Sequence, residues 1–144
     1  MSDRYVIISS DCHAGLACEE YRPYLEARFH PAFDEFLAER QASRDEALKM
    51  NYEYIMNWET HNEEGLRGAY DAQQRDKELD ADGVVAEVIF ADSDAITGKE
   101  SPPFGAGLSA GEITDPELAF AGARAHNRFL VDLCATSPAR RGGV

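Results

Sequence analysis

Short apolar runs alternate along the chain with longer stretches of helical spacing. Residues 5–9 form the first run, which is β-branched and predicts a strand buried on both faces, as parallel sheets use. The polar stretch 9–15 is expected to end it. Residues 84–90 predict a second strand, and residues 140–144 have the character of the entry to a third.

Apolar residues at helical spacing fill the intervals between these strands. Residues 19–58 are expected to be helical, with one helix ending and the next beginning at His30-Pro31, although 51–58 has no clean period. Residues 63–79 predict an amphipathic helix with Leu66, Tyr70 and Leu79 turned inward.

Two boundary signals are specific. Gly83 suits the left-handed position that follows a helix, which would end the helix before the second strand. Asp115 and Pro116 suit the cap and first turn of another helix, which is predicted to run to about Ala135. Residues 92–114 between them are rich in Gly and Pro and predict a long, mobile loop that could act as a flap.

Strands that alternate with helices predict βαβ units and a parallel sheet. The expected fold class is therefore α/β, with residues 1–144 as a single domain, because 144 residues suit one domain better than two. The first crossover is long and carries extra helices.

Charge and composition limit the range of possible functions. The net charge of -13 argues against nucleic acid and anionic membranes as partners, since both require a positive face. No apolar stretch is long enough to cross a membrane, and the apolar run near the N-terminus is too short for a signal peptide. Three cysteines without a CxxC pair indicate free thiols. A cytoplasmic protein with a small-molecule substrate is the expectation.

The most informative local pattern is Asp11-Cys12-His13, directly after the first predicted strand. Side chains two residues apart on a strand face the same way, so Asp11 and His13 would point together and Cys12 away from them. A carboxylate and an imidazole presented in parallel suit a divalent metal such as zinc. The alternative is an aspartate that caps the loop beside an exposed histidine.

Three segments, in order, resemble the amidohydrolase-related branch of the metal-dependent hydrolases. Residues 5–15 are similar to its first strand, and residues 79–90 are similar to its second strand and the approach to it. Residues 125–130, followed by 137–141, are similar to the helix that leads into its third strand.

The resemblance implies a (β/α)8 barrel of which this chain is the N-terminal part, with two strands and the stub of a third. It implies Asp11 and His13 as metal ligands, with the family's other ligands supplied from strands five, six and eight. A closed barrel needs typically ~250 residues. This chain alone is therefore expected to be inactive, to hold metal weakly, and to self-associate through uncovered sheet.

The activity implied is that of a metal-dependent hydrolase, in which a metal-activated water attacks an amide, ester or lactone. A decarboxylase on the same barrel is an alternative. A non-catalytic, acidic α/β module is the alternative from a different functional class.

Other side chains are weaker candidates. His30 is expected at the surface, His126 as a structural residue within a helix, and Cys12 as a buried, unreactive thiol. His61 lies in a segment that could fold over the exit of the first strand and reach substrate. Asp92 and Asp94 follow the second strand and would be ordinary polar loop residues or reach the barrel mouth.

Overall fold

A three-stranded sheet organises the molecule, whose computed structural model describes residues 5–91, 102–107 and 115–144. The strands are β1 (Ile7–Ala14), β2 (Val84–Ala91) and β3 (Arg141–Gly143), in the order β1-β2-β3. Both neighbouring pairs are parallel. The predicted parallel pairing of the first two strands is confirmed, and the third strand forms where the sequence predicted its entry.

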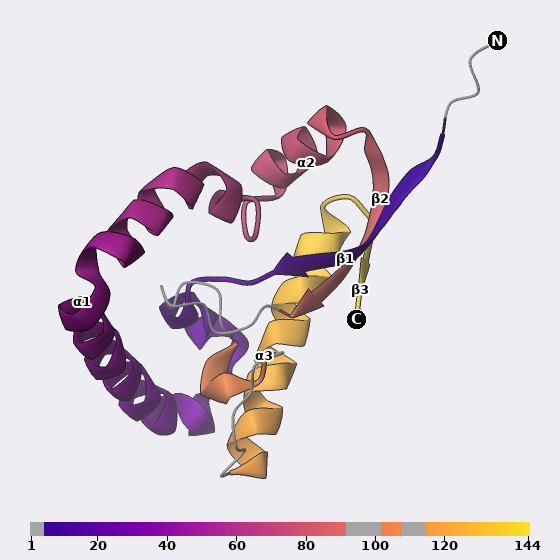
Figure 1. The fold of residues 1–144 in the computed structure, drawn as a ribbon. Helices are drawn as coiled ribbons and strands as arrows, with labels where there is room; N and C mark the ends of the chain where they lie inside the picture. Colours follow the sequence, from indigo (N-terminus) through magenta and orange to yellow (C-terminus); the bar gives the residue numbers. More distant parts are fainter. Residues whose placement is uncertain (1–4, 92–101, 108–114) are drawn as a thin grey trace.

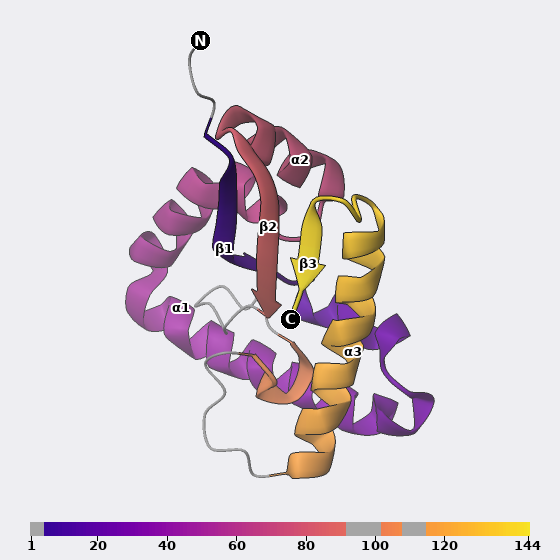
Figure 2. The same cartoon turned by 90° about the vertical axis from the view of Figure 1, so that its right-hand side faces the viewer.

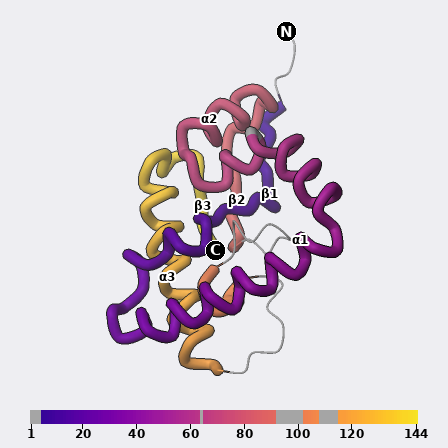
Figure 3. The backbone as a smooth tube through the Cα atoms, turned by 90° about the vertical axis from the view of Figure 1, so that its left-hand side faces the viewer, coloured from indigo at the N-terminus to yellow at the C-terminus, as the bar shows by residue number. Residues whose placement is uncertain are grey.

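The connections between the strands are mostly helical. They are the 3-10 helices η1 (Cys18–Tyr24), η2 (Ala27–Phe29) and η3 (Pro103–Gly105), and the α-helices α1 (His30–Arg67), α2 (Ala72–Ala81) and α3 (Pro116–Ala135). The described α-helices all lie on one side of the sheet (Figures 1 and 2). The strands are nearest the viewer in Figure 2, and α1 and α2 are nearest in Figure 3, which shows the opposite side. The molecule is thus a mixed α/β structure in which one face of the sheet is covered by helices. No helix in the described part of the chain combines the length and apolar character needed to span a membrane.

Helix boundaries differ from the sequence prediction in two places. The segment before His30 forms 3-10 turns instead of an α-helix, and Pro23 lies within η1, where it removes a backbone donor. The predicted helix over 63–79 is interrupted, because α1 ends at Arg67 and α2 begins only after Asp71. The Asp71 carboxylate accepts hydrogen bonds from the backbone N–H groups of Gln73 and Gln74, which fixes the start of α2. Leu66 and Tyr70 therefore do not share a helix with Leu79.

Both specific boundary signals are confirmed. Gly83 has φ +71° and joins α2 to β2. The Asp115 carboxylate accepts hydrogen bonds from the N–H groups of Glu117 and Leu118, with Pro116 in the first turn of α3. The stretch 51–58, which lacked a clean period, is helical and belongs to α1, whose backbone departs from helical geometry at Asn51 (φ -138°, ψ 34°). Figure 1 shows α1 as a long curved arm.

The first strand differs most from its prediction. It was expected to be buried on both faces and to end in the polar stretch, but Tyr5, Val6 and Ile8 are exposed and the strand continues to Ala14. β1 lies at the edge of the sheet, and the face that carries Ile8 has no described helix over it. Helices therefore bury only the other face of β1, towards its carboxyl end.

The hydrophobic core lies between the sheet and the helices. Its members include residues of η1, α1, β2 and α3: Tyr21, Phe33, Ile89, Phe129, Leu130 and Leu133. β3 packs very closely on α3, since a Cβ built on Gly143 would lie 2.5 Å from a methyl carbon of Leu130. A side chain at position 143 would push the strand off the helix.

Part of the predicted flap is anchored. Pro102 and Pro103 are buried, and the Phe104 ring packs against Phe33 and Phe36 of α1. The rest of that loop, 92–101 and 108–114, lies outside the described residues, as do the candidates Asp92 and Asp94.

Candidate functional site: the Asp11–His13 pair

A β-bulge aims the candidate ligands at the end of β1. Ser9 pairs with Glu87 and Cys12 with Ile89, so β1 contains one residue more than β2 over this interval. Bulges of this kind redirect side chains and are common beside functional sites. After the bulge, His13 pairs with Phe90 and Ala14 with Ala91.

Asp11 and His13 converge on the face of the sheet that no described helix covers. The Nε2 atom of His13 lies 3.5 Å from the Oδ1 atom of Asp11. The His13 ring lies beside that of Phe90, with 6.3 Å between the ring centroids. The His13 side chain is 35% exposed and that of Asp11 is 84% exposed, so both can be reached from solvent.

The tautomer of His13 follows from its other ring nitrogen. Nδ1 lies 3.0 Å from the carbonyl oxygen of Ala91, and a carbonyl only accepts, so Nδ1–H is the donor. In the neutral ring, Nε2 then carries the lone pair on the side of the Asp11 carboxylate, whereas in the imidazolium form Nε2 donates to that carboxylate. A histidine that donates one ring N–H to a backbone carbonyl and offers the other nitrogen is the usual arrangement of a metal ligand.

The pair fits a divalent cation but supplies only two ligands. Within the described residues, no group of three or more His, Cys, Asp or Glu side chains is placed to hold a metal ion. Zinc in catalytic sites normally has three protein ligands. Asp11 and His13 thus form part of a possible metal site.

The remaining histidines lie elsewhere. His61 is exposed on α1, and its ring bonds to the carbonyl of Asn57 one turn earlier. His30 is half-buried at the start of α1 and not at the surface as expected. His126 is buried in α3, and its Nδ1 is hydrogen-bonded to the Tyr21 hydroxyl at 2.9 Å. The same hydroxyl accepts from the backbone N–H of Leu16, which makes His126 part of the support of the β1 exit.

Cys12 points away from the pair, as alternation along the strand predicted. Its Sγ atom donates to the Ser9 hydroxyl on the helix-covered side of the sheet. Burial is the main reason that the pKa of the Cys12 thiol is raised above its ordinary value, which disfavours the reactive thiolate. Glu87, on the same side, also raises the pKa of the thiol through a hydrogen bond and through its charge.

Sequence reasoning missed a buried charge network directly beneath the pair. Glu87 of β2 is flanked by Arg75 of α2 and Arg141 of β3, and the Glu87 and Arg141 side chains are 0% exposed. Burial raises the pKa of the Glu87 carboxyl, but the hydrogen bonds and charge of Arg75 outweigh this, so the net pKa lies below its usual range. The available clue was a lone glutamate within the apolar run 84–90.

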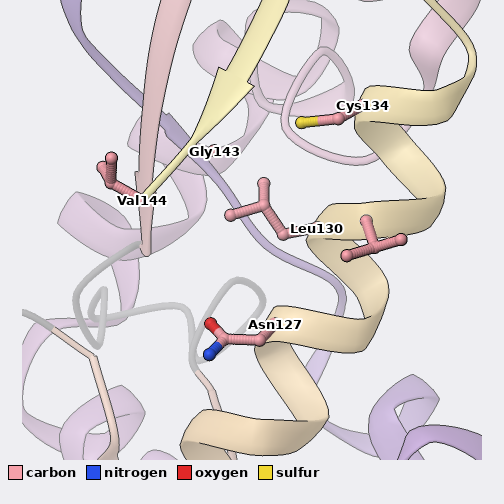
Figure 4. Close-up of a pocket in the computed structure, with 6 residues that line it drawn as sticks. Asn127, Leu130, Cys134, Gly143 and Val144 are labelled. Carbon is pink, nitrogen blue, oxygen red and sulfur yellow. The ribbon is translucent and has the colours of Figure 1, made fainter. Parts of the chain in front are cut away.

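A separate pocket of about 290 Å³ lies between α3 and the end of β3 (Figure 4). Its lining residues are Asn127, Leu130, Val131, Cys134, Gly143 and Val144. Burial raises the pKa of the Cys134 thiol, and no lining side chain carries a charge at neutral pH. Apart from this thiol, whose raised pKa disfavours the thiolate, the lining side chains supply no acid or base, so the Asp11–His13 pair remains the better candidate site.

Comparisons of the chain with protein-family models, with curated proteins and with solved structures gave no match. The case for a function therefore depends on the geometry of the Asp11–His13 pair and on the sequence resemblance.

Proposed function

We propose that Asp11 and His13 are two ligands of a divalent metal, most suitably zinc, in an amidohydrolase-type metal-dependent hydrolase. The observation that carries the proposal is the approach of Asp11 Oδ1 to His13 Nε2 at 3.5 Å, combined with the Nδ1–H bond to Ala91 that leaves Nε2 as a ligand nitrogen. The pair also lies at the carboxyl end of parallel strands, where α/β folds place their sites.

The arrangement of the sheet is compatible with a barrel as the parent fold. The strands follow one another in space in chain order, all parallel, and the described α-helices cover one face only. One half of a doubly wound sheet has the same strand order with its crossover helices on one face, so it is the sequence resemblance that favours the barrel. In a (β/α)8 barrel the uncovered face would line the interior, and Asp11, His13 and Phe90 would lie at its mouth.

In the proposed enzyme, each side chain has a defined task. His13 would hold the metal through Nε2 while Ala91 fixes its ring, and Asp11 would contribute an anionic oxygen. A divalent metal in this position supplies Lewis acidity, which polarises a substrate carbonyl and makes water a nucleophile near neutral pH. An amide, ester or lactone is the substrate class for that chemistry, and a decarboxylase with the same ligands is the alternative within the fold.

Zinc binding by the purified chain, measured by calorimetry after chelation and dialysis, tests the proposal. We expect weak binding, because two ligands are present, and no ester or amide hydrolysis above background. His13→Ala should weaken zinc binding by at least about tenfold. His61→Ala, which removes an exposed histidine on α1, is the matched control and should leave binding unchanged.

Three results would contradict the proposal. Zinc binding that survives His13→Ala would place the metal elsewhere. Equal losses in the two histidine variants would indicate general surface binding. Absence of zinc binding by the wild-type chain would favour a non-catalytic, acidic module.

A further inference from the structure

Arg75 links the candidate site to the interior of the molecule. Its side chain is 9% exposed and lies beneath the sheet, on the face opposite to Asp11 and His13. One of its terminal nitrogens, Nη1, donates to the backbone carbonyl of His13 at 3.0 Å and to that of Gly68 at 3.0 Å. The side chain therefore contacts β1 at the candidate ligand and the segment that follows α1.

Glu87 fixes the orientation of this guanidinium. Its carboxylate receives Nε of Arg75 at 2.8 Å and Nη2 at 2.7 Å, a bidentate pair that leaves Nη1 for the two carbonyls. Glu87 is on β2, the strand that also supplies the Ala91 carbonyl to the His13 ring. β2 thus holds both the backbone and the ring of His13. It holds the backbone through Glu87 and Arg75, and it holds the ring through the Ala91 carbonyl.

We propose that Arg75, oriented by Glu87, is a positioning residue for the Asp11–His13 pair, which sets the direction of the His13 ring and hence the affinity of the pair for a divalent metal. This inference rests on the proposed metal-binding function. Outer groups that orient a ligand histidine typically change metal affinity by 10–100-fold, and Arg75 does so here through the main chain of the ligand.

Arg141 provides a matched control for a purely structural role. It is also buried, and its Nε atom reaches Glu87, which it shares with Arg75, at 3.3 Å. Its other partners are Asp76, Ala72, Thr136 and Leu133, all on or beside α2 and α3. Among the described residues, its hydrogen bonds and ion pairs do not reach β1, so a loss of stability alone should be common to both arginines, whereas an effect on the pair should be confined to Arg75.

The first experiment compares Arg75→Lys with Arg141→Lys in zinc calorimetry and in urea unfolding. We expect both variants to unfold at lower urea, and only Arg75→Lys to weaken zinc binding by the folded protein, by about tenfold. Arg141→Lys should remain within about twofold of wild type. Equal zinc affinities in the two variants would overturn the positioning role.

A second measurement does not require metal. In the metal-free wild-type protein at a pH where His13 is neutral, the imidazole ¹⁵N shifts should report the Nδ1–H tautomer, which the bond to Ala91 fixes. Arg75→Lys should give a tautomer mixture, and Arg141→Lys should not. If the wild-type chain binds no zinc, the metal function fails, while this comparison still decides whether Arg75 orients the ring.

Glu87→Gln provides a gentler variant should Arg75→Lys not fold. It keeps the shape of the side chain and one oxygen acceptor, but it removes the bidentate anchor of Arg75. The positioning role predicts a tautomer mixture here as well, smaller than in Arg75→Lys. An unchanged single tautomer in Glu87→Gln would count against the role of Glu87 as the orienting group.

Discussion

Charged side chains have different roles on the two faces of the small sheet. On the helix-covered face, Glu87 and Ile89 are buried, and the Glu87 carboxylate is bonded by arginines on both sides. On the other face, Asp11 and His13 remain open to solvent beside Phe90. The first face uses its charges to hold elements together, whereas the second keeps them available.

This difference identifies which charges are structural. A buried carboxylate whose oxygens are occupied by guanidinium groups has no capacity left for a ligand, however strongly its pKa is shifted. The Nε2 atom of His13 and the Asp11 carboxylate, by contrast, can be reached from solvent. Coordination capacity and access, more than the size of a pKa shift, therefore indicate the candidate site in this molecule.

The largest expected effect is the loss of stability when the charge network on the helix-covered face is disrupted. Glu87→Leu leaves Arg75 and Arg141 buried without a counter-charge, so we expect the free energy of unfolding to fall by about 3–5 kcal/mol. Urea unfolding followed by circular dichroism measures it. Glu53→Gln, on the exposed surface of α1, is the control and should change stability by less than about 0.5 kcal/mol. A loss below about 1 kcal/mol in Glu87→Leu would show that the network does not support the fold.

The next effect concerns the open face. At a zinc concentration tenfold above the dissociation constant, linkage predicts that the wild-type chain gains about 1.4 kcal/mol of stability. Asp11→Ala should lose most of this gain while leaving the metal-free stability within about 0.5 kcal/mol, because the carboxylate is largely in solvent. Thermal unfolding with zinc and with chelator gives both quantities. A metal-independent loss of stability in Asp11→Ala would mean that the carboxylate is structural.

Sequence reasoning succeeded where the determinants are local. Asp115 and Pro116 fix the start of α3 through the backbone next to them, and Gly83 permits a positive φ that few other residues adopt. The spacing of Asp11 and His13 likewise determines that they share a face, since alternation is a property of the strand itself.

It failed where the outcome depends on distant partners. The burial of residues 5–8 depends on what covers β1, which the apolar run does not encode. Spacing of three to four residues suits both 3-10 and α-helices, so η1 was predicted as α-helix. The contact between Arg75 and the His13 carbonyl joins residues 62 positions apart, and no local pattern could show it.

Glu26 and two arginines form a partly exposed counterpart of the buried Glu87 network. Glu26 is bonded by Arg128 at 2.9 Å and Arg124 at 3.0 Å, the same composition as Glu87 with its two arginines, but in contact with solvent. The hydrogen bond from Arg128 is the main reason that the pKa of Glu26 is lowered from 4.5 to about 2. Because solvent screens this cluster, we expect Glu26→Gln to cost only about 1 kcal/mol at pH 7.

The pH dependence of this cost has a definite sign. A carboxyl with a depressed pKa in the folded state stabilises the protein fully above its unfolded pKa, so the difference between wild type and Glu26→Gln should be constant above about pH 5. It should decline as the pH falls through the interval from 4.5 to about 2. Urea unfolding at several pH values measures it, and a difference that grows on acidification would contradict the assignment.

The smallest expected change in folding stability comes from Ile8, which pairs with Ala86 on the uncovered face and is 58% exposed. Ile8→Lys should alter the free energy of unfolding by less than about 0.5 kcal/mol, because the side chain is already largely in water.

The main effect of Ile8→Lys should instead be on self-association of the chain. An apolar face without cover and an unpaired β1 edge recruit further copies of the chain, and a charge at that position opposes both. Sedimentation of the wild-type chain should therefore show concentration-dependent association that Ile8→Lys reduces. Met50→Lys, which places the same charge at an exposed apolar position of α1, should leave association unchanged. Equal effects of the two lysines would mean that added charge, and not the uncovered face, controls self-association.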